Sequence, residues 1–513
     1  MAANVAADDP APAVSAHVAS TTADAEACLA DMNKLLQACQ EDFRRRPHQH
    51  MALPQAMQKM RRAIQHPDPD IIREHIERWR VLKRCKSLVT MDKTFQSGSQ
   101  VEHRNAARKE VRTSMAESTE NGKVNDQDWK NKRQRAVYQA MKMNARVMVD
   151  VVDDGYEWLQ VRLLHPKRLA LQMTESGWSW GCYKKGDTVP VEEWEDVSLT
   201  KRLRLLVAAA KLNLHEYCVP RVRLVVPFIG RENLDFEVLF DQLAKMDPDV
   251  KVVIQNKHSR FLTNPPPEDF VSRLRGDPLA NLTPTLILEH TVLVDLISDL
   301  THCRLEVQPW HASATRTQIE EENGPEGRCM VKWLYPVLSG RRLTITKAAS
   351  EHLYHILETV GTETERERAR LIVPKPGEEQ LETEAEVRQR FQSLSVHDFP
   401  RDIQLPVEVD AQDWVSLDAL LEVGEGRIPP AAFRTCNMTL FSEYYRSTII
   451  SGWVSGNTVI TSNKEINGLV HRCIKSLALP TGQVCGPTIH TLQVARYMLS
   501  SHATPRDGCA RSI

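Results

Sequence analysis

Residues 285–300 read TLILEHTVLVDLISDL, and this stretch decides the fold class of the C-terminal half of the chain. Leu286, Ile287 and Leu288 form a short apolar run, which is typical of a strand that is buried on both faces. Apolar residues then recur at three- and four-residue steps, which predicts a helix; they are Leu293, Leu296, Ile297 and Leu300. A buried strand that leads directly into a helix is the unit from which parallel α/β sheets are built.

The same strand-and-helix pattern returns twice further along the chain. Residues 343–360 predict one such unit, and residues 458–477 predict another. The acidic, proline-bearing segment at about 375–412 is interpreted as an insertion. We therefore expect an α/β domain with a central parallel sheet over residues 280–500.

A second α/β domain is expected upstream, over residues 135–275. Extended segments with a turn at 153–155 predict a β-hairpin over 147–163, and helices then alternate with strands over 199–254. Turn-forming Pro, Gly, Asn and Asp residues at 264–278 mark the boundary between the two domains.

The first 134 residues indicate a helical leader and a flexible linker. Helical periodicity is present over 25–43 and again from Asp70 to about Val89. Residues 94–132 hold few large apolar side chains, which predicts a linker, and the Ala-rich residues 1–24 are expected to be disordered.

Composition restricts the class of protein. Of the 513 residues, 42% are hydrophobic and 26% charged, which is typical of a globular protein of more than one domain. The sequence contains no apolar run long enough for a membrane span and no secretory signal at its start, so we expect a soluble intracellular protein, cytoplasmic or nuclear. Its 11 cysteines form no C-x-x-C pair, which argues against a zinc site.

The net charge of -1 means that any contact with nucleic acid requires a local basic patch. The candidate patches have little aromatic interleaving, so an ordinary solvated surface is the favoured interpretation; they are Arg44, Arg45, Arg46, Arg61, Arg62, Lys130, Lys132, Arg133 and Arg135.

Several short motifs carry a resemblance to a known family. They are VDVV at 149–152, WGCYKKGD at 180–187, ILETVG at 356–361, ERERA at 365–369 and TSN at 461–463. In this order they resemble the eukaryotic family that includes the protein of open reading frame twenty-five on chromosome seven, which carries a domain of unknown function. The most specific of these motifs are ILETVG and ERERA.

The resemblance covers roughly residues 140–260 and 280–500 and implies that the C-terminal domain is PIN-like, a nuclease-type α/β fold. Such a nuclease needs three or four carboxylates at the carboxyl ends of its strands. Oxygen ligands suit Mg²⁺ or Mn²⁺, and two such ions can stabilise the attacking and leaving oxygens of a phosphodiester.

The resemblance assigns the remnant acidic site to five residues of this sequence. Glu289 stands where the first Asp is expected, and Glu351 or Glu358 could supply the acid on a helix. Asp295 is a candidate fourth ligand. Asn463 occupies the last position of a T-x-D motif, and an amide is a weaker ligand than a carboxylate. Another acid expected from the family is replaced by Trp453.

Each candidate also has a structural interpretation. Glu289 could favour the N-terminus of the following helix through capping or the helix dipole. Glu351 and Glu358 could lie on an ordinary solvated helix face, which is the favoured interpretation of that pair. Asp295 could be a buried polar residue that is paired with its neighbours.

Two functions remain open at this point. The favoured one is a non-catalytic RNA- or protein-binding module with a degenerate nuclease site, which needs no cofactor. The alternative is a metal-dependent ribonuclease with an altered carboxylate site that uses Mg²⁺ or Mn²⁺. No small-molecule cofactor and no membrane partner are expected, since the sequence contains no nucleotide-binding or catalytic fingerprint.

Overall fold

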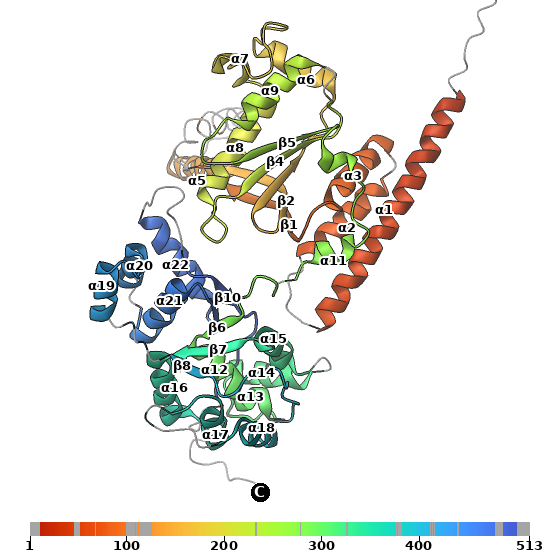
Figure 1. Cartoon of the computed structure of the whole chain (residues 1–513). Helices are drawn as coiled ribbons and strands as arrows, with labels where there is room; N and C mark the ends of the chain where they lie inside the picture. The colour runs from red at the N-terminus through yellow and green to blue at the C-terminus, as the bar shows by residue number, and fades with distance from the viewer. Residues whose placement is uncertain are drawn as a thin grey trace, which may run out of the picture. The chain divides into compact units, whose positions relative to one another are not determined.

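The computed structural model describes residues 11–45, 52–66, 68–98, 108, 111, 126–230, 233–277, 279–324, 327–375, 377, 382–410, 412, 414, 416–438, 441–477 and 486–499. The chain divides into two compact units, each with its own five-stranded sheet (Figure 1). Unit 1 comprises residues 1–39 and 50–277, and unit 2 comprises residues 40–49 and 278–513.

Unit 1 is built on a mixed sheet in the order β1-β2-β3-β4-β5. Its strands are β1 (Leu88–Gln96), β2 (Arg146–Asp153), β3 (Glu157–Val161), β4 (Arg221–Val226) and β5 (Val252–Asn256). The first three strands pair antiparallel and the last three pair parallel. Its helices are α1 (Ala11–Arg45), α2 (Ala52–Ile64), α3 (Pro69–Leu82), α5 (Asp126–Asn144), α6 (Pro166–Glu175), α7 (Val191–Trp194), α8 (Ser198–Leu212), α9 (Leu234–Ala244), α10 (Arg260–Thr263) and α11 (Phe270–Arg275). Only the part of α1 up to residue 39 belongs to this unit.

The hairpin predicted over 147–163 is confirmed as β2 and β3. Its three-residue turn, residues 154–156, places Asp154 at φ 52° and Gly155 at φ 71°, in the left-handed region that glycine adopts without strain. A Cβ at Gly155 would also lie 2.1 Å from Nε2 of His215. Glycine is therefore needed there for both its backbone freedom and its lack of a side chain.

Strand β1 corrects the sequence-based interpretation of residues 70–98. The helix expected to continue to Val89 ends at Leu82, and Leu88–Gln96 pairs antiparallel with β2 instead. β1 is an edge strand with a register shift, and most of its side chains are at least partly exposed. It therefore lacks the strict apolar alternation by which a strand is found in a sequence. Of the rest of the expected linker, residues 99–125 lie almost entirely outside the described residues, and residues 126–132 form the start of helix α5 rather than a linker.

Helices cover both faces of the unit 1 sheet (Figure 1). α6, α8 and α9 bury one face, with Val149, Trp158 and Leu224 contributed by the strands. α1, α2, α3 and α11 bury the other face against residues that include Leu159 and Val225. The leader helices are thus part of the core of this unit. α1 also begins at Ala11, well before the helix expected from residue 25, since alanine has the highest helix propensity; residues 1–10 lie outside the described part.

Unit 2 is built on a fully parallel sheet in the order β10-β9-β6-β7-β8. Its strands are β6 (Thr285–Leu288), β7 (Arg342–Thr346), β8 (Glu408–Asp410), β9 (Thr458–Thr461) and β10 (Ile489–Thr491). Its helices are α12 (His290–Ile297), α13 (Asp299–His302), α14 (Ser313–Asn323), α15 (Cys329–Leu338), α16 (Lys347–Val360), α17 (Glu363–Ile372), α18 (Glu384–Ser393), α19 (Ser416–Gly424), α20 (Pro430–Met438), α21 (Glu443–Ser455) and α22 (Lys464–Ser476). The chain runs outward from β6 to β8 and then returns to the other side of β6. The strand order therefore reverses between β6 and β9, which makes that gap a topological switch point.

The acidic segment 375–412, which the sequence predicts to be an insertion, is an integral part of unit 2. It contains α18, which begins with a capping box formed by Thr383 and Glu386, and it supplies the edge strand β8. Val387, Phe391 and Val407 are fully buried in the main core of the unit. These few apolar residues, spread among charged ones, are enough to hold the segment against the core, because helices in proteins are stabilised mainly by tertiary packing of their apolar face.

The ERERA motif forms a buried polar network. Arg368 is fully buried, and it donates from Nη1 to Oδ1 of Asp299 at 2.9 Å and to the carbonyl oxygen of Ile297 at 2.6 Å. Glu365 accepts from the backbone N–H of Asp299 at 3.0 Å and caps α17 together with Thr362. The motif therefore joins α13 to α17, and its charged residues have a structural role.

The sequence-based fold class is confirmed at the level of a mixed α/β protein with two sheets rich in parallel pairs. Among the described residues, none of the helices combines the length and the apolar character that crossing a membrane requires.

Candidate functional site

The candidate site lies at the carboxyl edge of the unit 2 sheet, at the switch point between β6 and β9. Leu288 and Ile460 are paired in register, so the next residues, Glu289 and Thr461, lie beside each other where the two strands end. The backbone N–H of Glu289 donates to the carbonyl oxygen of Ile460 at 2.9 Å, which fixes this arrangement. Open α/β sheets bind ligands outside the carboxyl ends of the strands at such a point.

The carboxylate of Glu289 is buried, and one of its two oxygens is hydrogen-bonded by protein groups. Its side chain is 1% exposed, and Oε2 accepts from the hydroxyl groups of Thr461, at 3.0 Å, and Thr291. Oε1 contacts Nδ1 of His290, but the geometry of this contact does not make a hydrogen bond. Glu289 therefore precedes α12 without capping it, and one of its oxygens has no hydrogen-bond donor.

Asp295 lies on α12 and points toward the residues that follow β9. The hydroxyl of Ser462 contacts Oδ2, and the backbone N–H of Arg496 donates to Oδ1 at 2.6 Å. Burial raises the pKa of Asp295 to about 8, despite these hydrogen bonds and the charge of Arg496, which act to lower it. The carboxyl group is thus neutral near pH 7 and is held by the protein.

Asn463 ends the T-x-N motif and serves as the N-cap of α22. Its Oδ1 accepts from the backbone N–H of Glu465 at 3.0 Å, and its Nδ2 donates to the hydroxyl oxygen of Tyr445 at 3.1 Å. Burial, and secondarily the charge of Glu289, raises the pKa of Tyr445 to about 12. Both ends of the amide are therefore used by neighbouring groups, as expected for an N-cap residue.

Aromatic rings close over the sheet edge beside Glu289. The ring of His290 lies 4.8 Å from the rings of His352 and Tyr444 and 5.5 Å from that of Tyr445, measured between centroids. His352 also stacks on Tyr444, with centroids 3.6 Å apart. Burial, more than the nearby histidines, lowers the pKa of His352 to about 4, so its ring is neutral at pH 7.

The sequence alone does not indicate this aromatic group as part of the site. The signals that could have found it are His290, directly after the first carboxylate, and the pair Tyr444-Tyr445 at the start of the helix that precedes β9. Neither of these sequence features has a spacing that marks it as part of a site before the fold is known.

Glu351 and Glu358 do not join the other candidates. Both lie on α16 with side chains 52% and 65% exposed, where they pair with Lys347 at 4.0 Å and Lys375 at 3.7 Å. Neither forms a hydrogen bond or ion pair with the described residues of the sheet edge. The structure thus brings together Glu289, Asp295 and Asn463, and leaves these two glutamates on the outer face of their helix.

The position where a further acid is expected is occupied by packing residues. Trp453 is buried on α21, which contacts β6, β7 and β9. A Cβ at its neighbour Gly452 would lie 2.4 Å from Cγ2 of Val459, so glycine lets α21 approach β9 closely. No group of three or more His, Cys, Asp or Glu residues in the described part of the chain is arranged to hold a metal ion.

The basic patches proposed from the sequence are only partly described. Arg61 and Arg62 are exposed on α2, as are Lys132 and Arg135 on α5. Arg46 and the side chains of Arg44, Arg45 and Lys130 lie outside the described residues.

Comparisons of the chain with protein-family models, with curated proteins and with solved structures find no match.

Proposed function

We propose that unit 2 is a non-catalytic binding module for RNA or protein, built on a nuclease-type, PIN-like fold whose metal site has been replaced by internal hydrogen bonds. The observation that carries this proposal is the state of the two acids at the switch point. Oε2 of Glu289 accepts from two threonine hydroxyls, and Asp295 is held by Ser462 and the backbone of Arg496.

Charge supports the same conclusion. A site for two divalent ions needs several ionised carboxylates, because Mg²⁺ gives up its water molecules reluctantly. Here the pKa of Asp295 is raised to about 8, and Asn463 contributes a neutral amide that already caps α22. Glu289 alone is too little negative charge to replace the hydration of one ion, and the described residues offer no group of ligands for a second.

The metal-dependent ribonuclease remains the alternative, and one observation favours it. Oε1 of Glu289 is buried at the switch point without a hydrogen-bond donor, next to His290 and close to Tyr445. A buried carboxylate oxygen without a partner is costly, and a cation would satisfy it. In that case Mg²⁺ or Mn²⁺ would be the cofactor, with Glu289 as its main ligand.

The test measures metal binding and RNA cleavage on the same full-length protein. We expect no saturable binding of Mn²⁺ by calorimetry, no Mn²⁺-dependent cleavage of single-stranded RNA, and retention of RNA or a protein partner after crosslinking. The double variant Glu289→Asp, Asn463→Asp should gain Mn²⁺ affinity, since a shorter acid loses contact with the threonines and a second carboxylate is added.

Glu358→Gln is the matched control, because this glutamate is exposed on α16 and should affect none of these measurements. Cleavage by the wild type that Glu289→Gln abolishes and Glu358→Gln leaves intact would establish the ribonuclease instead. Failure to crosslink any RNA or protein would contradict the binding function.

A further inference from the structure

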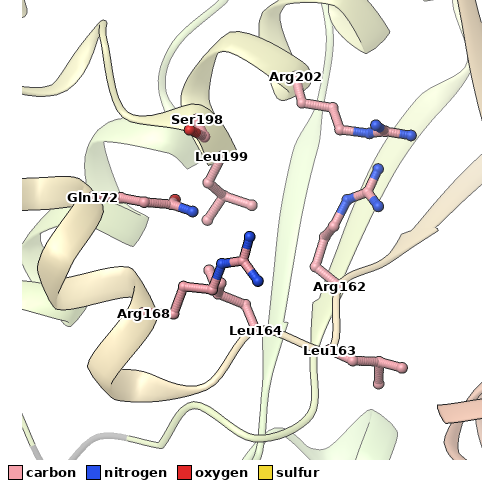
Figure 2. A pocket seen from close by; sticks show the side chains of 8 residues that line it. All are labelled: Arg162, Leu163, Leu164, Arg168, Gln172, Ser198, Leu199 and Arg202. Atoms are coloured by element: carbon pink, nitrogen blue, oxygen red, sulfur yellow. The ribbon is translucent and has the colours of Figure 1, made fainter. Parts of the chain in front are cut away.

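A pocket in unit 1 is lined by three arginines, none of which forms a hydrogen bond or an ion pair with another described residue. It has a volume of about 370 Å³ and lies between the end of β3, α6 and the start of α8 (Figure 2). Arg162, Arg168 and Arg202 line it together with Leu164, Gln172 and Leu199. This volume lies within the usual range of small-molecule sites.

The fold holds the three arginines in place from separate elements. Arg162 directly follows β3, and its backbone N–H donates to the carbonyl oxygen of Val225 at 2.8 Å, which fixes it beside β4. Arg168 lies in the first turn of α6, and Arg202 lies in the second turn of α8. In Figure 2 the guanidinium groups of Arg162 and Arg202 are drawn on one side of the pocket and that of Arg168 on the other, nearer Gln172 and Leu199.

Two of these guanidinium groups, those of Arg162 and Arg202, carry buried donors that lack acceptors, whereas Arg168 is exposed. Within the described part of the chain, none of the three forms a hydrogen bond or an ion pair. Nε and Nη2 of Arg162 and Nε of Arg202 are buried without any acceptor. Because buried polar groups are nearly always hydrogen-bonded, unpaired donors at one place indicate a missing acceptor. Three like charges also repel one another unless an anion lies between them.

Among the described residues, no acid supplies that acceptor. The lining of the pocket contains no carboxylate. The acid that Arg202 attracts electrostatically is Asp150, which accepts from the backbone N–H of Val161 at 2.7 Å and lies 3.6 Å from Arg78. The pocket therefore keeps an excess of positive charge.

The start of α8 adds to this positive potential. Ser198, its first residue, lines the pocket, and its N-cap residue Val197 makes no side-chain cap. The first turn also contains no acidic residue. Free N–H groups at a helix N-terminus attract anions, and here they are directed toward the same site as the arginines.

We propose that this pocket binds the phosphate of a small molecule that carries a phosphate monoester. A monoester has about two negative charges and three acceptor oxygens, which match three guanidinium groups. A polynucleotide backbone offers one charge per phosphate and favours an extended basic groove rather than a single recess. Leu164 and Leu199 form an apolar wall for the organic part of the ligand. The proposal concerns unit 1 and is independent of the function proposed for unit 2.

The test is calorimetric titration of the full-length protein with phenyl phosphate, inorganic phosphate and dimethyl phosphate at constant ionic strength. At about pH 8 the monoester is a dianion, because its second pKa is near 6. We expect saturable binding of phenyl phosphate, weaker binding of inorganic phosphate, and binding of the diester weaker by about tenfold or more, since charge-assisted bonds to a dianion are stronger. Arg162→Gln and Arg202→Gln should each weaken binding of phenyl phosphate by about tenfold.

The matched control is Arg204→Gln, an exposed arginine on the same helix that pairs with Glu195 at 3.2 Å and should leave binding unchanged. The melting temperatures of the unliganded pocket variants should equal or exceed that of the wild type, because they remove unpaired like charges, so lost binding would not reflect unfolding. Equal binding by wild type and Arg202→Gln, or no saturable binding of either phosphate probe, would overturn the proposal. So would binding of a short single-stranded RNA in the pocket without binding of phenyl phosphate.

Discussion

Thr461 donates its hydroxyl hydrogen to Oε2 of Glu289 across 3.0 Å, and this bond joins the carboxyl ends of β9 and β6 at the switch point of the unit 2 sheet. Both side chains are buried. The position that would offer a metal its first ligand is thus used to connect two central strands. Because this hydrogen bond supports the fold, the site can be tested by measuring the stability of variants as well as their activity.

Replacing Thr461 by Val should destabilise the protein by about 1–3 kcal/mol, because a buried carboxylate oxygen loses one of its donors. Thr344→Val is the matched control. Thr344 lies on the neighbouring strand β7 and donates to the neutral carbonyl oxygen of Leu286 at 3.1 Å, so we expect a cost of about 0.5–1.5 kcal/mol. Urea unfolding of the two variants measures the difference. Equal costs would mean that Glu289 is not satisfied through Thr461.

Asp295 should make the stability of unit 2 fall as pH rises. Its folded-state pKa of about 8 lies above the ordinary value of 3.8. Between these values the folded chain keeps a proton that the unfolded chain has lost, so the free energy of unfolding decreases with pH from about pH 4 to about pH 8. This stabilisation is fully present only below the lower value.

Asp295→Asn should remove that dependence, because an amide reproduces the neutral carboxyl group. The free energy of unfolding of the variant relative to the wild type should therefore increase by about 1.4 kcal/mol for each pH unit within this window. Chemical unfolding at pH 5 and pH 7 checks the slope, and contributions from other titrating groups cancel in the comparison. A difference that does not change with pH would show that Asp295 is ionised in the folded protein.

The buried pair of Arg368 and Asp299 should be sensitive to a change that preserves charge. Arg368→Lys keeps the positive charge but loses the planar group that contacts Asp299 and the carbonyl oxygens of Ile297 and Leu394. We expect a loss of about 3–5 kcal/mol, as when a buried ion pair is broken. Arg370→Lys, at an exposed position of the same helix, should change stability by less than about 0.5 kcal/mol. A small loss of stability in Arg368→Lys would mean that the ERERA motif does not hold α17 against α13.

Helix α16 packs against the unit 2 core through Leu353, Tyr354 and Leu357. Leu357→Ala should cost about 2–5 kcal/mol of stability, because its side chain is fully buried. Ile356, the residue before Leu357, is only partly buried, so Ile356→Ala should cost clearly less. Thermal unfolding of the two variants measures which substitution costs more stability. A larger cost for Ile356→Ala would mean that Ile356, rather than Leu357, is on the buried face of α16.

The sequence by itself determined the elements whose side chains follow a strong local pattern. Leu286–Leu288, the hairpin over 147–163 and the helices after β6, β7 and β9 all show apolar periodicity, since burial of one face demands it. It also identified Glu289 and Asn463 as residues that follow strands. Parallel strands end at one edge of a sheet, so their meeting there could be expected.

Only the tertiary structure decided what the candidate residues do. α16 carries both Glu351 and His352, but the rotation of the helix exposes the glutamate and stacks the histidine on Tyr444. The burial that keeps Asp295 neutral arises only on folding, as do its hydrogen bonds with Ser462 and Arg496, more than 160 residues away along the chain.

Edge strand β1 and the pocket of unit 1 likewise depend on distant pairing. β1 is held by its neighbour β2 rather than by its own pattern, and Arg162 and Arg202 line one pocket only because β3 pairs with β4, against which α8 packs. The apolar periodicity of a helix or strand can be recognised in its local sequence, because burial of a single face of that element imposes it. Hydrogen-bond partners, burial and charge state are set by contacts between elements, and these exist only once the chain has folded.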